Sequence, residues 1–374
     1  MMSKKFVSWL IVLVMCSLLI NTGCRPPAED TTKLQVPPEE EKPKIVVEEE
    51  KPKVVEEEKA KIVEEEKPKV VVEEEKPAVE LALKFTAQDS TTYKCTQEAR
   101  RSIKWEGPST DDNVFRGGQT SNKVEMTFTQ QIQSVDDKGN AVAKITIKNF
   151  KYLSVIRDNP VVDFDSAREK DQNNPLAKLI GQSYTIEITP AGQVSKVIDV
   201  SQAQEAVKGT SPVTKTALTM LSSDIIKERH TIAAIPAMDR TKLRTGDNWS
   251  SIKSFSFGLM GSRSYERVYT LKEIKDTGSR RIAVVQMKAV PTTEMAEKLH
   301  KEQTIGDFSK MFENTDTYTG RLNLDLSSGK VENCLETVQS EWIAIEPAIG
   351  QEEEKEPAVL TMTATRIYSL EKID

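Results

Sequence analysis

Hydrophobic and polar residues alternate through most of the chain from residue 81 onward, which is the pattern of β-strands with one buried face. Val124, Met126 and Phe128 alternate before the polar turn 136–140, and the alternation resumes over 141–147. This arrangement predicts a β-hairpin.

The predicted hairpin belongs to a longer pattern that occurs twice. A second hairpin is predicted around the turn 276–279, and its glycine, Gly278, follows Gly139 of the first turn by 139 residues. Gly181 and Gly320, each 42 residues after its turn glycine, both begin a further strand and turn. We interpret this order as two copies of one strand-rich unit. The alternative is that hairpin turns simply favour glycine.

One helix is predicted between the two copies. Apolar residues at helical spacing predict it over 213–233, where it would cover one sheet. A final strand is predicted over 358–370, after a polar loop at 352–357. The predicted fold class is mainly β, with duplicated curved antiparallel sheet units, one or two covering helices and a disordered tether before them. The two units would form two curved sheets, each partly wrapped on its helix.

The predicted organisation has five segments. They are a lipoprotein signal peptide over 1–23, a disordered Glu/Lys/Pro/Val repeat tether over 24–80, a first β unit over 81–200, a helical connector over 201–245 and a second β unit over 246–374.

The chain begins with the features of an export signal. Lys4 and Lys5 precede an apolar run over 6–20, which is shorter than the roughly 20 residues that a membrane-spanning helix needs. The run ends at Asn21-Thr22-Gly23-Cys24, which resembles the bacterial lipoprotein signal, with Asn21 where Leu is usual. The resemblance implies that Cys24 is acylated and becomes the mature N-terminus. The alternative is an uncleaved, marginal membrane anchor.

The segment 39–80 repeats a unit of eight or nine residues rich in Glu, Lys and Pro. It holds 16 Glu and 9 Lys, a net charge of -7, so the rest of the chain sums to about +1 out of a total of -6. Its prolines oppose a continuous helix, and its charges favour an extended spacer. The spacer either contacts a wall polymer or protein partner or serves only as a tether. The balanced charge of the body argues against nucleic-acid binding.

Lipid anchoring would place the protein in the cell envelope, exported and membrane-anchored, facing the periplasm or the outside. Disulfides can persist in such a compartment. Two cysteines remain in the β body, Cys95 and Cys334. They form either one disulfide across the body or two separate buried thiols.

The sequence contains little that indicates catalysis. His230 and His300 have no Cys or His at metal-ligand spacing, and surface or helix-end positions are expected for both. Asp163, Asp165 and Asp171 lie in one stretch and are the candidates for a carboxylate-based hydrolase. No catalytic residue, metal or cofactor is predicted. The aromatic residues that could line an apolar interior, as a filled core or a lipid pocket, are Trp105, Trp249, Trp342, Phe255 and Phe257.

Three phrases carry a resemblance to a known family. Residues 181–186 (GQSYTI), 189–194 (TPAGQV) and 242–250 (KLRTGDNWS) resemble an uncharacterised family of exported lipoproteins from planctomycete-type bacteria, over roughly 85–370. The duplicated curved sheets are also similar, in topology only, to half-barrel lipid carriers of the envelope. The resemblance implies no activity. We therefore expect a non-enzymatic binding or interaction module anchored to a membrane, and the narrower alternative is a carrier of a hydrophobic ligand.

Mass spectrometry of the mature N-terminus tests the lipid anchor. We expect an acylated Cys24 at the first position, because cleavage before it removes residues 1–23. Detection of Met1 or Met2 as the N-terminus would contradict the lipoprotein prediction.

Overall fold

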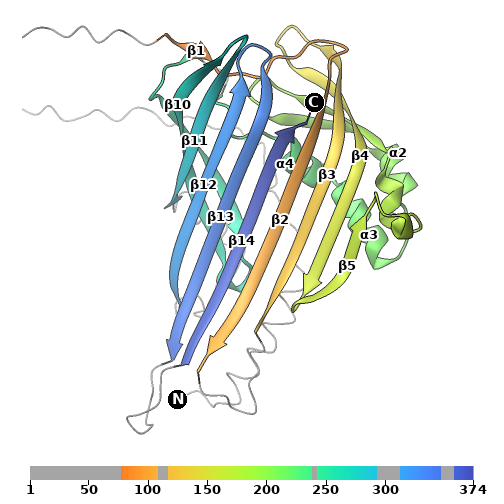
Figure 1. The fold of residues 1–374 in the computed structure, drawn as a ribbon, viewed down its shortest axis with the longest axis vertical. Helices are drawn as coiled ribbons and strands as arrows, with labels where there is room; N and C mark the ends of the chain where they lie inside the picture. Colours follow the sequence, from red (N-terminus) through yellow and green to blue (C-terminus); the bar gives the residue numbers. More distant parts are fainter. Residues whose placement is uncertain (1–76, 108–116, 238–241, 293–311, 347–357, 374) are drawn as a thin grey trace, which may run out of the picture. The chain divides into compact units, whose positions relative to one another are not determined.

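A computed structural model describes residues 77–107, 117–237, 242–292, 312–346 and 358–373. The predicted signal peptide, Cys24, the tether up to residue 76 and His300 lie outside these ranges. The described residues form one large antiparallel sheet with helices on one of its faces (Figure 1). This arrangement confirms the mainly β fold class.

The large sheet contains twelve strands. Its order is β7-β6-β4-β3-β2-β14-β13-β12-β11-β10-β9, and β5 pairs with β4 beside this path. The strands are β2 (Ser90–Glu106), β3 (Gly118–Val135), β4 (Ala141–Ile156), β5 (Asn159–Asp165), β6 (Ser183–Ile188), β7 (Val194–Asp199), β9 (Asn248–Ser256), β10 (Ser262–Thr277), β11 (Arg280–Thr292), β12 (Glu313–Asp325), β13 (Lys330–Glu346) and β14 (Ala358–Lys372).

Both predicted hairpins are present, as β3–β4 and β10–β11. In the first turn, one carboxylate oxygen of Asp136 accepts hydrogen bonds from the backbone N–H groups of Lys138 and Asn140. Gly139 and Gly278 have φ of 81° and 66°, a region that side chains with a Cβ disfavour. The turn sequences therefore fix where the strands reverse.

The two halves of the chain have the same strand order but share one sheet. β2-β3-β4-β6-β7 and β9-β10-β11-β12-β13 are each a run of neighbouring antiparallel strands. The prediction of two separate sheets is wrong, because β14 pairs with β13 on one side and with β2 on the other. The last strand of the chain thus joins the two halves.

The helical connector differs from the single helix predicted over 213–233. It contains α2 (Ser201–Ala206), α3 (Pro212–Met220) and α4 (Ser223–His230). The break has a local cause, because the Ser222 hydroxyl accepts from the Ile225 N–H and starts a new helix. Short 3₁₀ helices are η1 (Glu169–Asp171), η2 (Pro175–Leu179) and η4 (Gly258–Met260). None of the helices in the described ranges is long and apolar enough to cross a membrane.

The ordered body begins before the predicted end of the tether at residue 80. β1 (Val79–Glu80) pairs with β8 (Lys242–Leu243), and the Val79 side chain is buried. Val79 and Leu81 are both buried, and their apolar surface stabilises this part of the body.

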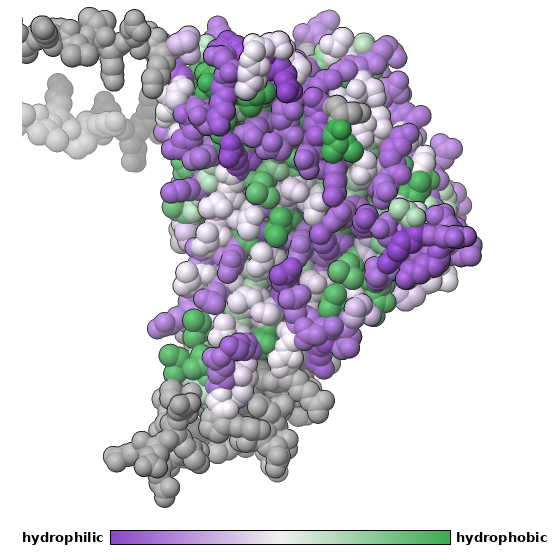
Figure 2. All heavy atoms as spheres, in the orientation of Figure 1, coloured by the Kyte–Doolittle hydropathy of each residue, from purple (hydrophilic) through white to green (hydrophobic). Residues whose placement is uncertain are grey.

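The outer face of the sheet, turned away from α4, is mainly polar (Figure 2). Hydrophilic side chains cover most of it, and hydrophobic ones lie singly or in small groups, as on many protein surfaces. The apolar residues of the alternating strands therefore face the helices.

Cys95 and Cys334 are both free and buried. Leu370 of β14 lies opposite Cys95 on one side and Cys334 on the other. The two cysteines are therefore two strand spacings apart, about 9.6 Å, whereas a disulfide needs Cα atoms within about 6.8 Å. Of the two alternatives, the structure has separate buried thiols. Burial raises the pKa of Cys95 to about 12 and also raises the pKa of Cys334.

Truncating Leu370 tests the role of β14. We expect Leu370→Ala to lower the free energy of unfolding by about 2–5 kcal/mol, because it leaves a cavity in the middle of the sheet. Ser369→Ala, on the opposite face of β14, should change it by less than about 0.5 kcal/mol. Chemical denaturation measures both, and equal losses in the two variants would contradict this placement.

Candidate functional site

A cavity of about 910 Å³ lies between the inner face of the sheet and the segment that contains α3 and α4. Strand residues on its wall include Val124, Trp249, Phe255 and Val338, and α4 contributes Ile225. Aliphatic and aromatic surface thus makes up much of the lining.

The cavity exists because the sheet curls. Tyr152 on β4 and Trp249 on β9 both line it, although eight strand steps separate β4 from β9. In a flat sheet these strands would be about 38 Å apart. The curvature of the strands is visible in Figure 1.

α4 is attached to three separate strands across the inner face. The Tyr184 hydroxyl on β6 lies 2.6 Å from His230 Nε2. The Tyr368 hydroxyl on β14 donates to the Arg229 carbonyl at 2.9 Å, and Lys253 Nζ on β9 lies 3.2 Å from a Glu228 carboxylate oxygen. The helix therefore connects strands from both halves of the sheet.

His230 is the last residue of α4, but it is buried rather than exposed. Burial, together with the positive charge of Arg229, holds its pKa well below the ordinary histidine value. The neutral ring packs edge-on against Phe128, with ring centroids 4.8 Å apart. Of the two expected positions, the helix end is confirmed and the surface is wrong, and the buried side chain holds α4 in place.

Arg229 is fully buried beside His230. Its two terminal nitrogens each donate to the Met220 carbonyl at 3.2 Å. Met220 is the last residue of α3, where the carbonyls lack helical partners and the helix dipole is negative. This contact fixes the end of α3 to α4. Both helices line one side of the cavity.

Polar groups enter the cavity wall on the sheet side. Glu336 on β13 accepts from the Tyr318 hydroxyl at 2.6 Å, and Arg267 lies 3.5 Å from the same carboxylate oxygen. Burial and the negative charge of Glu336 raise the pKa of Tyr318, so the hydroxyl stays protonated and donates. These three residues form a buried ionic network beside apolar surface.

Aromatic rings complete the wall. Phe255 packs edge-on against Tyr318, with ring centroids 5.5 Å apart, and Phe257 packs in the same way on Trp342 at 5.1 Å. Of the five aromatic residues predicted for an apolar interior, Trp249 and Phe255 line the cavity, and Phe257 and Trp342 lie in the core. Trp105 is half-buried on β2 and is not part of the lining.

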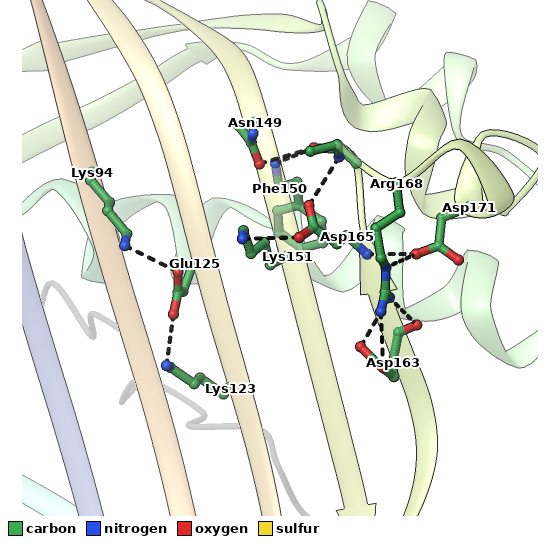
Figure 3. Close-up of polar contacts among 12 residues, drawn as sticks. Lys94, Lys123, Glu125, Asn149, Phe150, Lys151, Asp163, Asp165, Arg168 and Asp171 are labelled. Carbon is green, nitrogen blue, oxygen red and sulfur yellow. Dashed lines mark hydrogen bonds and ion pairs between the residues drawn. The ribbon is translucent and has the colours of Figure 1, made fainter.

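Asp163, Asp165 and Asp171, the carboxylates considered for hydrolysis, lie close together in ion pairs (Figure 3). Arg168 contacts Asp163 at 3.0 Å and Asp171 at 2.6 Å, and Lys151 contacts Asp165 at 2.9 Å. Arg168 lowers the pKa of Asp163, and the Ala167 N–H with Lys151 lowers the pKa of Asp165. These ion pairs hold β5 and the loop after it against β4, and we call them the aspartate clamp.

Metal binding finds no support in the described ranges, because no three His, Cys, Asp or Glu side chains there are grouped as ligands. Asp163 and Asp165 point to basic partners rather than to a shared empty point (Figure 3).

The sequence patterns did not lead us to predict the charged residues of the cavity wall, such as Glu336 and Arg366. Glu336 lies between the inward-facing Cys334 and Val338, and Arg366 lies between Ala364 and Tyr368. A charged residue at a position whose neighbours two residues away are apolar is a signal that could have found both. In the alternating pattern such a residue must face the interior.

The chain is similar to known proteins in two comparisons, one with a family model and one with a solved structure. A family model described as a family of unknown function (DUF6263) matches residues 138–331, which are 194 of the 374 residues. No curated protein matches the chain. A solved structure described as lipid-protein interactions in lipovitellin is similar with a TM-score of 0.36 and 12% identity, covering 78% of this chain and 26% of that chain. The chain thus spans about a quarter of the lipovitellin chain, and this likeness carries no conclusion.

The aspartate clamp can be tested by its pH dependence. Asp165 has a lowered pKa in the folded protein, so its stabilisation is present above the unfolded value of about 3.9 and is lost as the pH falls through the folded value. We expect Asp165→Asn to lower the thermal unfolding midpoint at pH 7, with a difference from wild type that is smaller at pH 3.

Asp137→Asn is the matched control, because Asp137 is exposed in a turn and has no ion pair among the described residues. It should leave the midpoint unchanged at both pH values. A pH-independent loss in Asp165→Asn would show that the charge is not what stabilises the hairpin.

Proposed function

The chain belongs to DUF6263, a family of unknown function, and we propose that it is a non-enzymatic binding protein whose cavity holds a hydrophobic small molecule. The observation that carries this proposal is the cavity of about 910 Å³ between the curled sheet and α4. Small-molecule sites in proteins commonly measure about 300–1,000 Å³, with mostly apolar walls and a few polar groups. The cavity has this size, and most of its lining surface is apolar, although charged residues such as Glu228, Lys253 and Glu336 also line it.

The lining favours binding over a space that is merely poorly packed. Interiors are close-packed, and apolar voids cost stability in proportion to their volume. Here the polar residues that face the space are tied to one another, as Glu336 is to Tyr318 and Arg267. The sheet wall of the cavity is therefore held in place by fixed contacts, which supports a preformed binding site.

We propose further that the binding body is exported and held at a membrane of the cell envelope through acylated Cys24. The repeat segment 39–80 would serve as its spacer, with the charges and prolines that favour extension. A tethered carrier could load or release a hydrophobic molecule at the membrane surface. A wall polymer or a protein remains the alternative partner of the spacer.

A carboxylate-based hydrolase has less support. Asp163, Asp165 and Asp171 are all engaged in ion pairs with Arg168 or Lys151, and none of them lines the cavity. General acid–base catalysis needs a carboxyl group with a pKa near the working pH. The lowered pKa values of Asp163 and Asp165 move away from it.

Native mass spectrometry, combined with organic extraction, tests the binding function. The protein would be the chain from residue 24 onward with Cys24→Ser, so that it can be handled without detergent. We expect a stoichiometric hydrophobic adduct that organic solvent removes. A clean apo mass, together with no binding of a neutral hydrophobic dye, would overturn the proposal.

A cavity-filling substitution makes the test specific. Ala99 lines the cavity from β2 but is exposed, so a larger side chain there can enter the space without displacing the packed core. We expect Ala99→Trp to weaken binding of the neutral dye N-phenyl-1-naphthylamine about tenfold or more, which corresponds to about 1.4 kcal/mol. Fluorescence titration measures the dissociation constant.

Lys148→Trp is the matched control, because Lys148 is exposed on β4 and does not line the cavity. It adds the same aromatic ring and should leave the dissociation constant unchanged. Equal affinities in Ala99→Trp and wild type would exclude this cavity as the dye site.

A further inference from the structure

The cavity wall contains a group of uncharged polar side chains on β2, β3 and β4. Its members, Gln97, Asn122 and Tyr152, all line the cavity. Val124, a buried residue of β3, lies opposite Gln97 on β2 and opposite Tyr152 on β4. Asn122 is two residues before Val124, so it lies on the same face of the sheet and is a diagonal neighbour of both. The register therefore brings three polar side chains together around Val124.

The hydrogen bonds within this group leave amide groups unused. The Tyr152 hydroxyl donates to the Asn122 side-chain oxygen at 3.2 Å, and burial raises the pKa of Tyr152, so the hydroxyl stays protonated. The Asn122 amide nitrogen and the whole side-chain amide of Gln97 have no hydrogen-bond partner among the residues that the structure describes. Both residues are half-buried. Their N–H groups are therefore available to a ligand in the cavity.

The carboxylates of the lining already have basic partners. The pairs are Glu98 with Arg100 at 2.6 Å, Glu228 with Lys253 at 3.2 Å, and Glu336 with Arg267 at 3.5 Å. Transfer of an ionised group from water into a cavity costs far more free energy than transfer of an uncharged polar group. The group formed by Gln97, Asn122 and Tyr152 is itself uncharged, so it suits an uncharged ligand head better than an ionised one.

The polar group lies at the open side of the cavity. Ala99, which lines the cavity and is exposed, lies directly opposite Asn122. Ala99 is also opposite Arg366 on β14, and Arg366 is opposite the buried Val338 on β13. Three strand steps, about 14 Å along the sheet, therefore separate Asn122 from Val338. One end of this path is polar and accessible and the other is apolar and buried, which is the arrangement that an amphiphile needs.

We propose that the cavity takes an uncharged amphiphile of the acylated polyol class, whose head binds Asn122 and Gln97 while its hydrocarbon chain lies along Val338 and Phe255. This inference rests on the proposed binding function and names its class of ligand. The ester and hydroxyl oxygens of such a head accept hydrogen bonds from amide N–H groups, and its hydroxyls donate to the Gln97 side-chain oxygen. A hydrocarbon without a head would exclude water from the two amides and leave them unpaired, which is unfavourable.

Displacement of N-phenyl-1-naphthylamine by ligands with the same twelve-carbon chain tests the inference. The ligands are monododecanoylglycerol, dodecanoate and dodecyltrimethylammonium, each below its micelle concentration, at pH 8 with the Cys24→Ser chain from residue 24. We expect monododecanoylglycerol to displace the dye at concentrations about tenfold below those of either ion. Added salt should leave its displacement unchanged, because screening acts on charged groups.

Gln97→Met and Asn122→Leu, made separately, are the decisive variants, because each keeps the approximate size of the side chain and removes its amide. We expect each to weaken binding of monododecanoylglycerol about threefold to tenfold, which corresponds to the loss of one neutral hydrogen bond. The dissociation constant of the dye should stay within about twofold of wild type, which reports an intact cavity.

Gln131→Met is the matched control, because Gln131 is exposed on β3 and does not line the cavity. It makes the same chemical change outside the site and should keep the wild-type affinity for monododecanoylglycerol and for the dye.

The outcomes separate the two proposals. Displacement by either ion at concentrations equal to or below those of monododecanoylglycerol would overturn the uncharged class and leave the binding function standing. Wild-type affinity for monododecanoylglycerol in both Gln97→Met and Asn122→Leu would overturn the placement of the head and with it the inference. Absence of dye binding in the wild-type chain, together with a clean apo mass, would overturn both proposals.

Discussion

The pairing of β14 with both β13 and β2 is the constraint on which the rest of the structure depends. It joins two meanders from opposite ends of the chain into one sheet that can curl around a common interior. It also sets the register that places Leu370 between the two buried cysteines and Arg366 opposite Ala99. Without this strand each half would expose a long strand edge, which proteins normally cover or pair.

The cavity exists because the helix that covers the sheet is much shorter than the strands. α4 has eight residues and is about 12 Å long, whereas β13 has seventeen residues and spans about 57 Å. So short a helix cannot fill the groove of so long a sheet. Its side chains are instead used to attach it, through Glu228, Arg229 and His230 to strands of both halves. The space that remains beside it is lined largely by strand residues.

The interior combines apolar packing with buried charge, and the two have different roles. The inward-facing side chains near Leu370 are apolar. They supply the hydrophobic stabilisation, since burial of apolar surface is the main favourable term in folding. Burial of the polar side chains of Tyr318, Glu336 and Arg267 costs desolvation free energy. Their mutual contacts offset this cost.

The sequence by itself determined the strands, the hairpin turns and the repeated order, because alternation and glycine turns are local properties of the chain. It also placed Trp249 and Phe255 in an apolar interior. It could not decide that β14 lies in the middle of one sheet, or that Cys95 and Cys334 flank Leu370. Those features depend on pairings between residues up to 279 positions apart, such as Cys95 with Leu370 at 275 and Tyr93 with Lys372 at 279. Local pattern assigns a residue to a face of its strand, but only the register between distant strands decides which side chains meet there.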